Sequence, residues 1–435
     1  MAGDRAPERL AIETRGPLDG HVSVPGSKSI TNRALLLAAL ADGESRLSGG
    51  LDSDDTVVMR AALGALGIGL EATSAEAPWI VHGRGGRFQV PDPAEDLVLD
   101  CGNSGTTVRF LTAALALASG PVVVDGNARM RERPISDLVN GLRDLGVELT
   151  TLGDADCPPL RLQGGGVPGG SALIDGSQSS QYVSAIALAA PYAARDIELE
   201  FKDGIIVSRP YIDLTLDVMR AFGADAKWRD GDRLWIKAGQ TYQARDYTIE
   251  PDASSAAYPF CAAAIAGGRV SVSNIPSDSL QADFKILDLL ERMGCGVNRV
   301  GDTVSVTAPD DTLRSLGEVD MNDFPDAALA YAVVALFADG PTTITNVANM
   351  RIKETDRLAA LETELGKLGA RVTAGPDSLR IEPGPMRGAE IETYDDHRMA
   401  MSLALAGLRV PGIVILDPGC VSKTWPAYFE AFADL

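Results

Sequence analysis

The sequence predicts an α/β protein of two domains, each built from three copies of one unit in which helices pack inside an envelope of sheet. Three observations support this fold class. The chain has 435 residues, which is too many for one comfortable hydrophobic core. Two families of glycine-terminated helical segments alternate along it at a nearly constant period. Short β-like runs follow the segments of the first family.

The first family consists of Ala- and Leu-rich segments that stop at small residues, with ends about 72 to 77 residues apart. Its members are 34–43, 110–120, 182–193, 258–267, 328–340 and 399–412. Their apolar residues recur at helical spacing, and a Gly usually stands where a left-handed C-terminal cap forms. The β-like runs that follow them include 121–126, 269–275, 342–347 and 413–418.

The second family interleaves with the first and again ends each segment on Gly. Its members are 59–67, 138–146, 215–223, 286–294 and 361–369, and the chain ends inside a sixth copy at 426–435. The repeating unit is therefore helix, strand, turn, helix, strand, strand, used six times, which suggests two domains of three units. Because a single unit does not bury its own apolar face, we expect helices of neighbouring units to pack together.

The charge balance limits the partners. With 39 basic and 60 acidic residues, the formal net charge is −21, which argues against nucleic acid and anionic membranes. An anionic small molecule stays possible if basic residues converge locally. Five widely spaced cysteines are typical of reduced thiols in a cytoplasm. The N-terminal segment has no signal-peptide core, and no apolar run reaches membrane-spanning length, so we expect a cytoplasmic protein.

The unusual polar residues collect just before the first helix of each unit. The six entrances read KSITNR, CGNSGTTVR, SQSSQY, PDASSAA, DFPDAA and YDDHR. Ser, Thr, Asn and Asp cap helix N-termini, and capping alone is the favoured interpretation of PDASSAA. Capping leaves Lys28, Arg33, Arg109, His397 and Arg398 unexplained, because the helix dipole disfavours cations there. A bound anion would remove this conflict, since N–H groups facing a Lys or Arg make a phosphate or carboxylate site.

A second set of loops, which follows the strands, is also basic: NARMRERPI, GIIVSRPYI, NMRIKETDRL and PGCVSKTWP. Taken alone, NMRIKETDRL is typical of ion pairs on a solvated helix; the recurrence of basic residues in several units favours a shared role. Other motifs fail: PGSKS lacks the spacing of a Walker loop, CGNSGTT is not a hydrolase elbow, and HExxH is absent. With three histidines and no CxxC pair, we expect no metal and no cofactor.

Nine segments in order resemble the EPSP synthase family of enolpyruvyl transferases along essentially the whole chain. They are PGSKSITNRALLLAAL, GNSGTTVRFL, RMRERPISDL, SSQYVSA, SRPYIDLTLDVM, DFPDAALAYAVVALFA, RIKETDRL, YDDHRMAM and SKTWPAYFE. The resemblance implies a two-domain inverse α/β barrel with six βαβαββ repeats and the active site in the interdomain cleft. It places residues 1–26 and 251–435 in one domain and 27–250 in the other.

The family's reaction transfers the enolpyruvyl group of phosphoenolpyruvate to the 5-hydroxyl of shikimate 3-phosphate and releases phosphate. The resemblance assigns one set of residues to shikimate 3-phosphate: Lys28, Ser29, Arg33, Ser179, Ser180, Gln181, Ser208, Tyr211, Asp326, Asn349 and Lys353. It assigns an overlapping set to phosphoenolpyruvate: Lys28, Asn103, Gly105, Thr106, Arg133, Gln181, Arg357, His397, Arg398 and Lys423. Two anionic substrates would explain a basic site in an acidic, monomeric protein.

The reaction needs a base for the attacking hydroxyl and an acid that protonates C3 of phosphoenolpyruvate. The resemblance implies Asp326 as the base and Glu354 as the acid, with Lys353 able to share either role and Lys28 touching both substrates. Gly105 favours inhibition by glyphosate, the family's phosphoenolpyruvate-competitive inhibitor. Phe110 and the loop NSGTT depart from the common pattern beside that site, and leave sensitivity open.

Two other functions compete with this one. The sister enzyme that acts on UDP-N-acetylglucosamine shares the repeats, but it typically carries Lys-Asn in the first motif and a reactive Cys in a mobile loop. Here the first motif is Lys-Ser, and the loop at 125–133 has no Cys. A non-catalytic phosphosugar-binding protein on the same scaffold would keep the arginines and lose the carboxylates, whereas Asp326 and Glu354 are both present.

Overall fold

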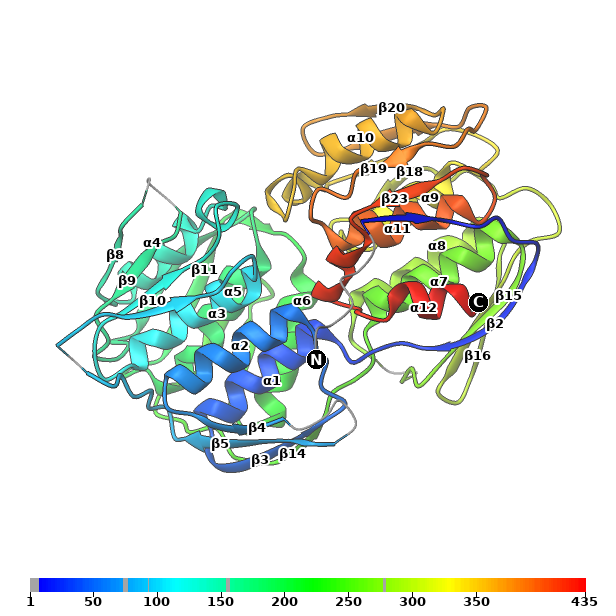
Figure 1. Ribbon diagram of the computed structural model, residues 1–435. Coiled ribbons are helices and arrows are strands. Elements are labelled where there is room, and N and C mark those ends of the chain that lie inside the picture. Colours follow the sequence, from blue (N-terminus) through cyan, green and yellow to red (C-terminus); the bar gives the residue numbers. More distant parts are fainter. Residues whose placement is uncertain (1–7, 73–76, 93, 154–156, 277–278) are drawn as a thin grey trace. The chain divides into compact units, whose positions relative to one another are not determined.

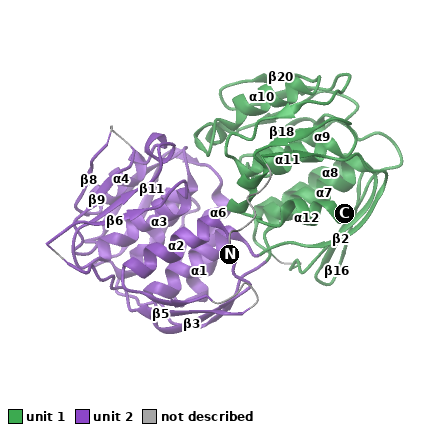
Figure 2. Ribbon diagram, viewed as in Figure 1, with its two compact units in different colours: residues 1–25, 251–435 green, residues 26–250 purple. Residues whose placement is uncertain are grey.

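The computed structural model describes residues 8–72, 77–92, 94–153, 157–276 and 279–435 (Figure 1). The expectation about the N-terminal segment falls partly on residues 1–7, outside this range. The chain forms two compact units, residues 26–250 (unit 2) and residues 1–25 with 251–435 (unit 1), as Figure 2 shows. Each unit has its own apolar core.

In unit 2, three four-stranded sheets surround the helices. In hydrogen-bonding order, the first sheet contains β14 (Asp246–Thr248), β3 (Asp42–Ser48), β5 (Trp79–Arg84) and β4 (Gly69–Glu71). The second contains β6 (Leu97–Asp100), β7 (Val122–Asp125), β9 (Leu160–Leu162) and β8 (Leu149–Thr151). The third contains β10 (Gly170–Gly176), β11 (Ile197–Ile206), β13 (Arg233–Ile236) and β12 (Ala226–Arg229). The first two strands of each sheet are parallel and the others antiparallel.

Unit 1 repeats this arrangement, except that its last sheet has three strands among the described residues. Its first sheet contains, in order, β2 (Leu18–Ser23), β15 (Gly268–Ser273), β17 (Thr303–Thr307) and β16 (Gly296–Val300), and β2 is parallel to β15. The second contains β18 (Gly317–Asp320), β19 (Thr342–Thr345), β21 (Leu379–Glu382) and β20 (Arg371–Ala374). The third contains β22 (Glu390–Ile391), β23 (Val414–Leu416) and β1 (Arg9–Ala11). The N-terminal β1 pairs antiparallel with β23, with Arg9 opposite Leu416. The sixth repeat is therefore completed by a strand from the other end of the chain.

The first-family helices lie inside these sheets. They are α1 (Lys28–Leu40), α3 (Gly105–Ala114) and α5 (Ser180–Ala189) in unit 2, and α7 (Ala253–Ala266), α9 (Ala328–Ala335) and α11 (His397–Gly407) in unit 1. Every residue of α3, α9 and α11 is buried, as expected for helices that are apolar all round. In unit 1, α7, α9 and α11 pack on one another, and β2 and β15 lie against α7 (Figure 1).

The second-family helices have one buried face, and all but the last of them are followed by a glycine in the left-handed conformation. They are α2 (Asp54–Ala65), α4 (Ser136–Asp144), α6 (Arg209–Ala221), α8 (Ile286–Arg292), α10 (Arg357–Lys367) and the shorter α12 (Tyr428–Ala433). The glycines that follow α2 to α10 have φ between 81° and 108°, which other residues rarely adopt. The predicted unit of helix, strand, helix, strand, strand is thereby confirmed.

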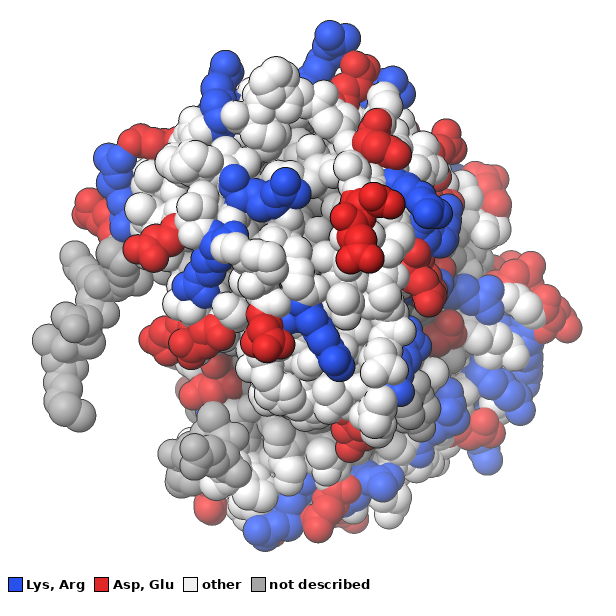
Figure 3. Space-filling view, turned by 90° about the vertical axis from the view of Figure 1, so that its right-hand side faces the viewer, with Lys and Arg blue, Asp and Glu red and all other residues white. Residues whose placement is uncertain are grey.

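None of the helices within the described ranges is both long and apolar enough to cross a lipid bilayer. On the face shown in Figure 3, basic and acidic side chains are interspersed among uncharged ones. Of the basic residues in the predicted site, Lys28 and Arg398 lie at the N-terminal ends of the inner helices α1 and α11, whereas Arg357 begins the second-family helix α10.

Candidate active site

In unit 2, Lys28 is the first residue of α1, and its charge is balanced by a buried carboxylate. Its Nζ lies 3.3 Å from Oδ2 of Asp55, which belongs to the first turn of α2. The Lys28 side chain is 15% exposed and that of Asp55 is 5% exposed. An ion pair at this depth loses less strength to solvent than a surface pair. Asp55 therefore holds the lysine at the helix entrance, next to Ser29.

Arg33 lies one turn further along α1, buried among neutral acceptors. Its Nε donates to Thr215 Oγ1 at 2.7 Å, and its terminal nitrogens donate to the carbonyl oxygens of Ser29 at 2.8 Å and Tyr211 at 3.2 Å. A longer bond reaches Ser184 Oγ at 3.4 Å. Burial lowers the pKa of Arg33 to about 10, so it keeps its charge at neutral pH. It fastens α1 to α5 and α6.

Phe110, the departure from the family pattern, has a definite place beside Arg33. The ring is fully buried on α3, and the Arg33 guanidinium lies 5.1 Å from its centroid. A cation over an aromatic face gains about 0.5–2 kcal/mol when shielded from water. Phe110 therefore helps to stabilise the charge of Arg33, which has no carboxylate partner among the described residues.

The entrance of α3 brings two guanidiniums to Gly105. A Cβ added at this glycine would lie 2.8 Å from a terminal nitrogen of Arg133 and 2.9 Å from one of Arg109. Arg133 donates to Asn103 Oδ1 at 3.3 Å, and Arg109 donates to the side-chain oxygen of Gln181 at 2.6 Å. Only glycine fits here without displacing a buried arginine.

The entrances of α5 and α6 complete the polar set in unit 2. Gln181 donates from Nε2 to Thr106 Oγ1 at 3.2 Å, which links α5 to α3. Ser179 caps α5 by accepting from the Gln181 amide, and Ser180 is buried at its first position. Ser208, with φ 51°, precedes α6 and its carbonyl accepts from the Tyr211 amide at 3.1 Å. Cations and helix N-termini thus meet here, as an anion site requires.

In unit 1, one carboxylate bridges two buried guanidiniums. Asp326 Oδ1 accepts from Arg357 at 3.0 Å, and its Oδ2 accepts from Arg398 at 2.9 Å. Arg357 also donates two bonds to Asp396, at 2.7 and 3.2 Å, and one to Glu354, at 3.0 Å. Asp326 therefore occupies the position that the carboxylate of an anionic ligand would take between the two guanidiniums.

The two arginines differ in their other partners. Besides Asp326, Arg398 donates to neutral oxygens, Ser254 Oγ at 3.0 Å and Tyr258 OH at 3.3 Å. Burial tends to lower the pKa of Arg357, but Asp396, Glu354 and Asp326 raise it above its usual value. Burial likewise tends to lower the pKa of Arg398, but Asp326, together with smaller contributions from Tyr258, Asp283 and Asp252, raises it above its usual value. Both therefore stay charged.

Lys423 extends this network from the 3-10 helix η6 (Pro418–Lys423). Its Nζ lies 3.5 Å from Glu354 Oε1, and both side chains are nearly buried, at 10% and 8% exposure. Lys353 directly follows η5 (Ala348–Ile352), where Asn349 is buried. His397 is the fully buried first residue of α11, and its Nδ1 lies 3.7 Å from Asp396 Oδ1. The predicted acid and base thus share one cluster with Arg357, Arg398 and Lys423.

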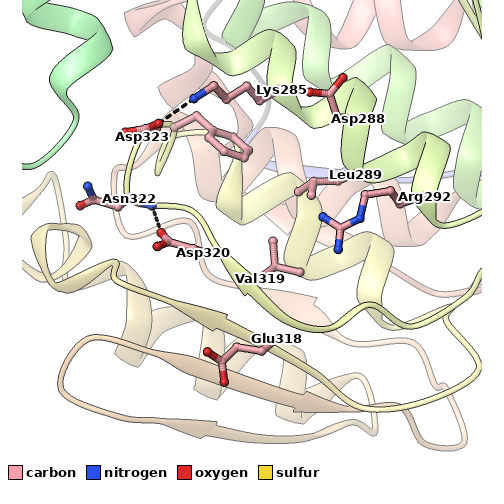
Figure 4. A pocket seen from close by; sticks show the side chains of 10 residues that line it. Lys285, Asp288, Leu289, Arg292, Glu318, Val319, Asp320, Asn322 and Asp323 are labelled. Carbon is pink, nitrogen blue, oxygen red and sulfur yellow. Dashed lines mark hydrogen bonds and ion pairs between the residues drawn. The ribbon is translucent and has the colours of Figure 1, made fainter.

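A separate cavity of about 440 Å³ lies in unit 1, between α8 and the segment from β18 to Phe324 (Figure 4). Carboxylates outnumber cations in its lining, and Lys285 pairs with Asp323 at 2.6 Å across it. None of the sequence-predicted site residues lines this cavity, and its charge does not suit a phosphorylated ligand.

The predicted residues fall into groups that hydrogen bonds connect within each unit. Sequence reasoning missed Asp55 and Asp396 as partners of the predicted cations. It singled out Arg109 only as an unexplained cation. The sequence around Asp55 indicated only the start of a helix. Asp396 belongs to the helix entrance YDDHR, where capping of α11 was already a sufficient explanation for it. The cap predicted in PDASSAA is present, because Asp252 accepts from the Ser255 amide. Capping is not the segment's whole role, however, because Ser254 also accepts from Arg398.

Comparisons with known proteins agree over nearly the full length. A family model described as EPSP synthase (3-phosphoshikimate 1-carboxyvinyltransferase) matches residues 12–432. The 3-phosphoshikimate 1-carboxyvinyltransferase of Photobacterium profundum is 46% identical over 430 residues, which cover 98% of this chain and 99% of that protein. The protein of the same name from Nostoc punctiforme is 45% identical over 416 residues, 96% of each chain.

Solved structures of enolpyruvyl transferases have a similar fold. An EPSP synthase of Acinetobacter baumannii superposes with a TM-score of 0.81 at 26% identity and covers 98% of each chain. The enolpyruvyl transferase NikO of Streptomyces tendae, with a TM-score of 0.78 at 21% identity over 98% of this chain and 97% of that one, shares the fold. By its family model, its relatives and its fold, this chain belongs to the EPSP synthase (3-phosphoshikimate 1-carboxyvinyltransferase) family.

Proposed function

We propose that this chain transfers the enolpyruvyl group of phosphoenolpyruvate to the 5-hydroxyl of shikimate 3-phosphate and releases phosphate. The observation that carries the proposal is the bridge from Asp326 to Arg357 and Arg398, with Glu354 and Lys423 beside it. This places two buried cations for a carboxylate or phosphate next to two carboxyl groups that can move protons. Full-length similarity to enzymes of this name supports the substrates.

Binding is proposed to follow the two clusters. The phosphate and hydroxyls of shikimate 3-phosphate would contact the unit 2 helix entrances and the unit 1 residues that the family pattern assigns to it. Phosphoenolpyruvate would contact Arg357 and Arg398 through its carboxylate, displacing Asp326 from the two guanidiniums. Arg133, Lys28 and Lys423 would neutralise its phosphate. Both clusters would serve this one reaction.

Once released from the arginines, Asp326 would accept the proton of the 5-hydroxyl while the oxygen of that hydroxyl attacks C2 of phosphoenolpyruvate. Glu354 would donate a proton to C3, which gives a tetrahedral intermediate. Loss of a proton from C3 and departure of phosphate from C2 would then restore the double bond. Lys353 and Lys28 would stabilise charge near these steps, and a general acid or base typically contributes about 10²–10⁴ in rate.

The test is phosphate release from phosphoenolpyruvate. We expect it to depend on shikimate 3-phosphate and to be absent with UDP-N-acetylglucosamine, the acceptor of the sister enzyme. Release with that second acceptor, or binding of both substrates without turnover, would refute the proposal. We further propose a monomeric, cytoplasmic enzyme that glyphosate inhibits in competition with phosphoenolpyruvate. A glyphosate inhibition constant far above the KM for phosphoenolpyruvate would contradict the last point.

A further inference from the structure

The backbone immediately before Asp396 is held in an unfavourable conformation. Tyr394 and Asp395 have φ of 56° and 53°, so two consecutive non-glycine residues adopt the left-handed region. Such residues cost free energy and persist only where the surrounding structure over-determines them. Neither residue is among those assigned to substrates or to proton transfer.

The strained pair sets the direction of the Asp396 carboxylate. Asp396 is fully buried, and its amide donates to the Thr393 carbonyl at 2.9 Å. Its carboxylate accepts the two bonds from Arg357 and a third, at 2.9 Å, from the Arg398 amide. Any relaxation of residues 394 and 395 would therefore turn the carboxylate away from Arg357.

A hydrogen bond to α10 helps to hold Tyr394 in place. Its hydroxyl donates to Glu364 Oε1 at 2.7 Å, although 39% of the tyrosine is exposed. Glu364 is fully buried on α10, where its Oε2 accepts from Lys367 Nζ at 2.7 Å and from the Glu392 amide at 3.2 Å. Packing alone does not fix a ring this exposed, so the restraint comes from the hydroxyl, which interacts with Glu364 and also with the Thr363 side chain.

Glu364 and Arg357 belong to the same helix. They are seven residues apart on α10, which is two turns, so they share one face. That face contacts the 394–396 segment at two points, through the tyrosine hydroxyl and through the Asp396 carboxylate. The helix thus fixes both the arginine and the loop that orients it.

We propose that Tyr394 and Glu364 are positioning residues: their hydrogen bond holds the strained 394–395 backbone so that Asp396 keeps Arg357 aimed at its ligand. The kinetic consequence rests on the proposed function, in which Arg357 binds the carboxylate of phosphoenolpyruvate. The structural consequence, a loosened loop, does not depend on it.

The kinetic test is Tyr394→Phe, which deletes only the hydroxyl. We expect KM for phosphoenolpyruvate to rise about tenfold, as for one lost hydrogen bond to a charged group, with KM for shikimate 3-phosphate unchanged. The control is Tyr242→Phe, which also removes one tyrosine hydroxyl bond, in this case a buried one to the Leu188 carbonyl at 3.0 Å in unit 2. Equal KM values for phosphoenolpyruvate in the two variants would overturn the proposal.

Hydrogen exchange separates this inference from the proposed function. Peptides that cover residues 393–400 should exchange faster in Tyr394→Phe than in the wild-type protein, even if the wild-type protein proves inactive. Asp395→Gly, added to Tyr394→Phe, should bring the exchange back toward wild type, because glycine adopts positive φ without strain. Unchanged exchange in Tyr394→Phe would refute the inference, whereas absent wild-type turnover would refute only the proposed function.

Discussion

Asp326→Asn removes the charge that Arg357 and Arg398 share while it keeps the shape of the side chain. Arg357 retains Asp396 and Glu354, so it stays neutralised. Arg398 keeps its hydrogen bonds to the neutral Ser254 and Tyr258 oxygens. Asp283 and Asp252 still interact with its charge, but more weakly than Asp326 does. The cost of the substitution therefore falls on Arg398.

The size of that cost can be worked from the structure. Removing one partner of a buried ion pair typically costs about 3–5 kcal/mol. Asp326 is 23% exposed, and the Asn oxygen still accepts one bond, so we expect a loss of about 2 kcal/mol. For a unit of this size, Tm should fall by about 4–8 °C. The control Asp323→Asn, which breaks an exposed pair with Lys285, should cost less than about 1 kcal/mol.

Turnover and binding should respond in opposite directions. Loss of the base should lower kcat in the shikimate 3-phosphate-dependent release of phosphate by about 10²–10⁴. Phosphoenolpyruvate no longer competes with Asp326 for the two arginines, so its KM should stay the same or fall, and it should raise Tm more in the variant than in the wild type. A kcat within about threefold of wild type, or a tenfold rise in this KM, would refute the reasoning.

Three further predictions concern other parts of the molecule. Lys28→Ala should raise KM for both substrates in steady-state kinetics and leave Asp55 buried without its lysine. A rise in KM for only one substrate would mean that Lys28 binds a single phosphate group. Gly105→Ala should raise KM for phosphoenolpyruvate and not for shikimate 3-phosphate, because the methyl group displaces Arg133 and Arg109; equal KM values would show that the arginines adjust freely. Burial raises the pKa of the Cys101, Cys295 and Cys420 thiols to about 12 and also raises that of Cys261. The four thiols therefore stay protonated, and they should not react with a disulfide reagent at pH 8 until the protein is unfolded. Rapid labelling of any of these four in the native protein would contradict that burial.

The repeat could be predicted because its signal is local. Helices such as α9 are apolar on every side, and second-family helices end at glycines like Gly223, whose φ of 88° the sequence implied. In the last sheet, β23 falls in the predicted run 413–418, but β22 and β1 carried much less signal. Ile391 belongs to a two-residue strand, and the pairing of Arg9 with Leu416 joins residues that no local pattern connects.

The site was predictable by residue type more than by role. Arg33 was expected at a substrate, yet the structure shows it donating to Thr215 and to two backbone carbonyls, which is a tertiary arrangement that no spacing rule contains. Asp396 was overlooked because an acidic residue at a helix start already has a sufficient local explanation. Whether the predicted residues bind the two substrates stays a prediction.

The pairing of β2 with β15 has a consequence for synthesis on the ribosome. Leu18 is made early, but its parallel neighbour Gly268 follows 250 residues later, and Leu416 follows its partner Arg9 by about 400 residues. Unit 2 has all its strands once Thr248 is out, so it can fold while the first strands of unit 1 wait unpaired. The order of translation therefore allows the inserted unit to fold first, whereas the discontinuous unit cannot complete its last sheet until β23 has been made.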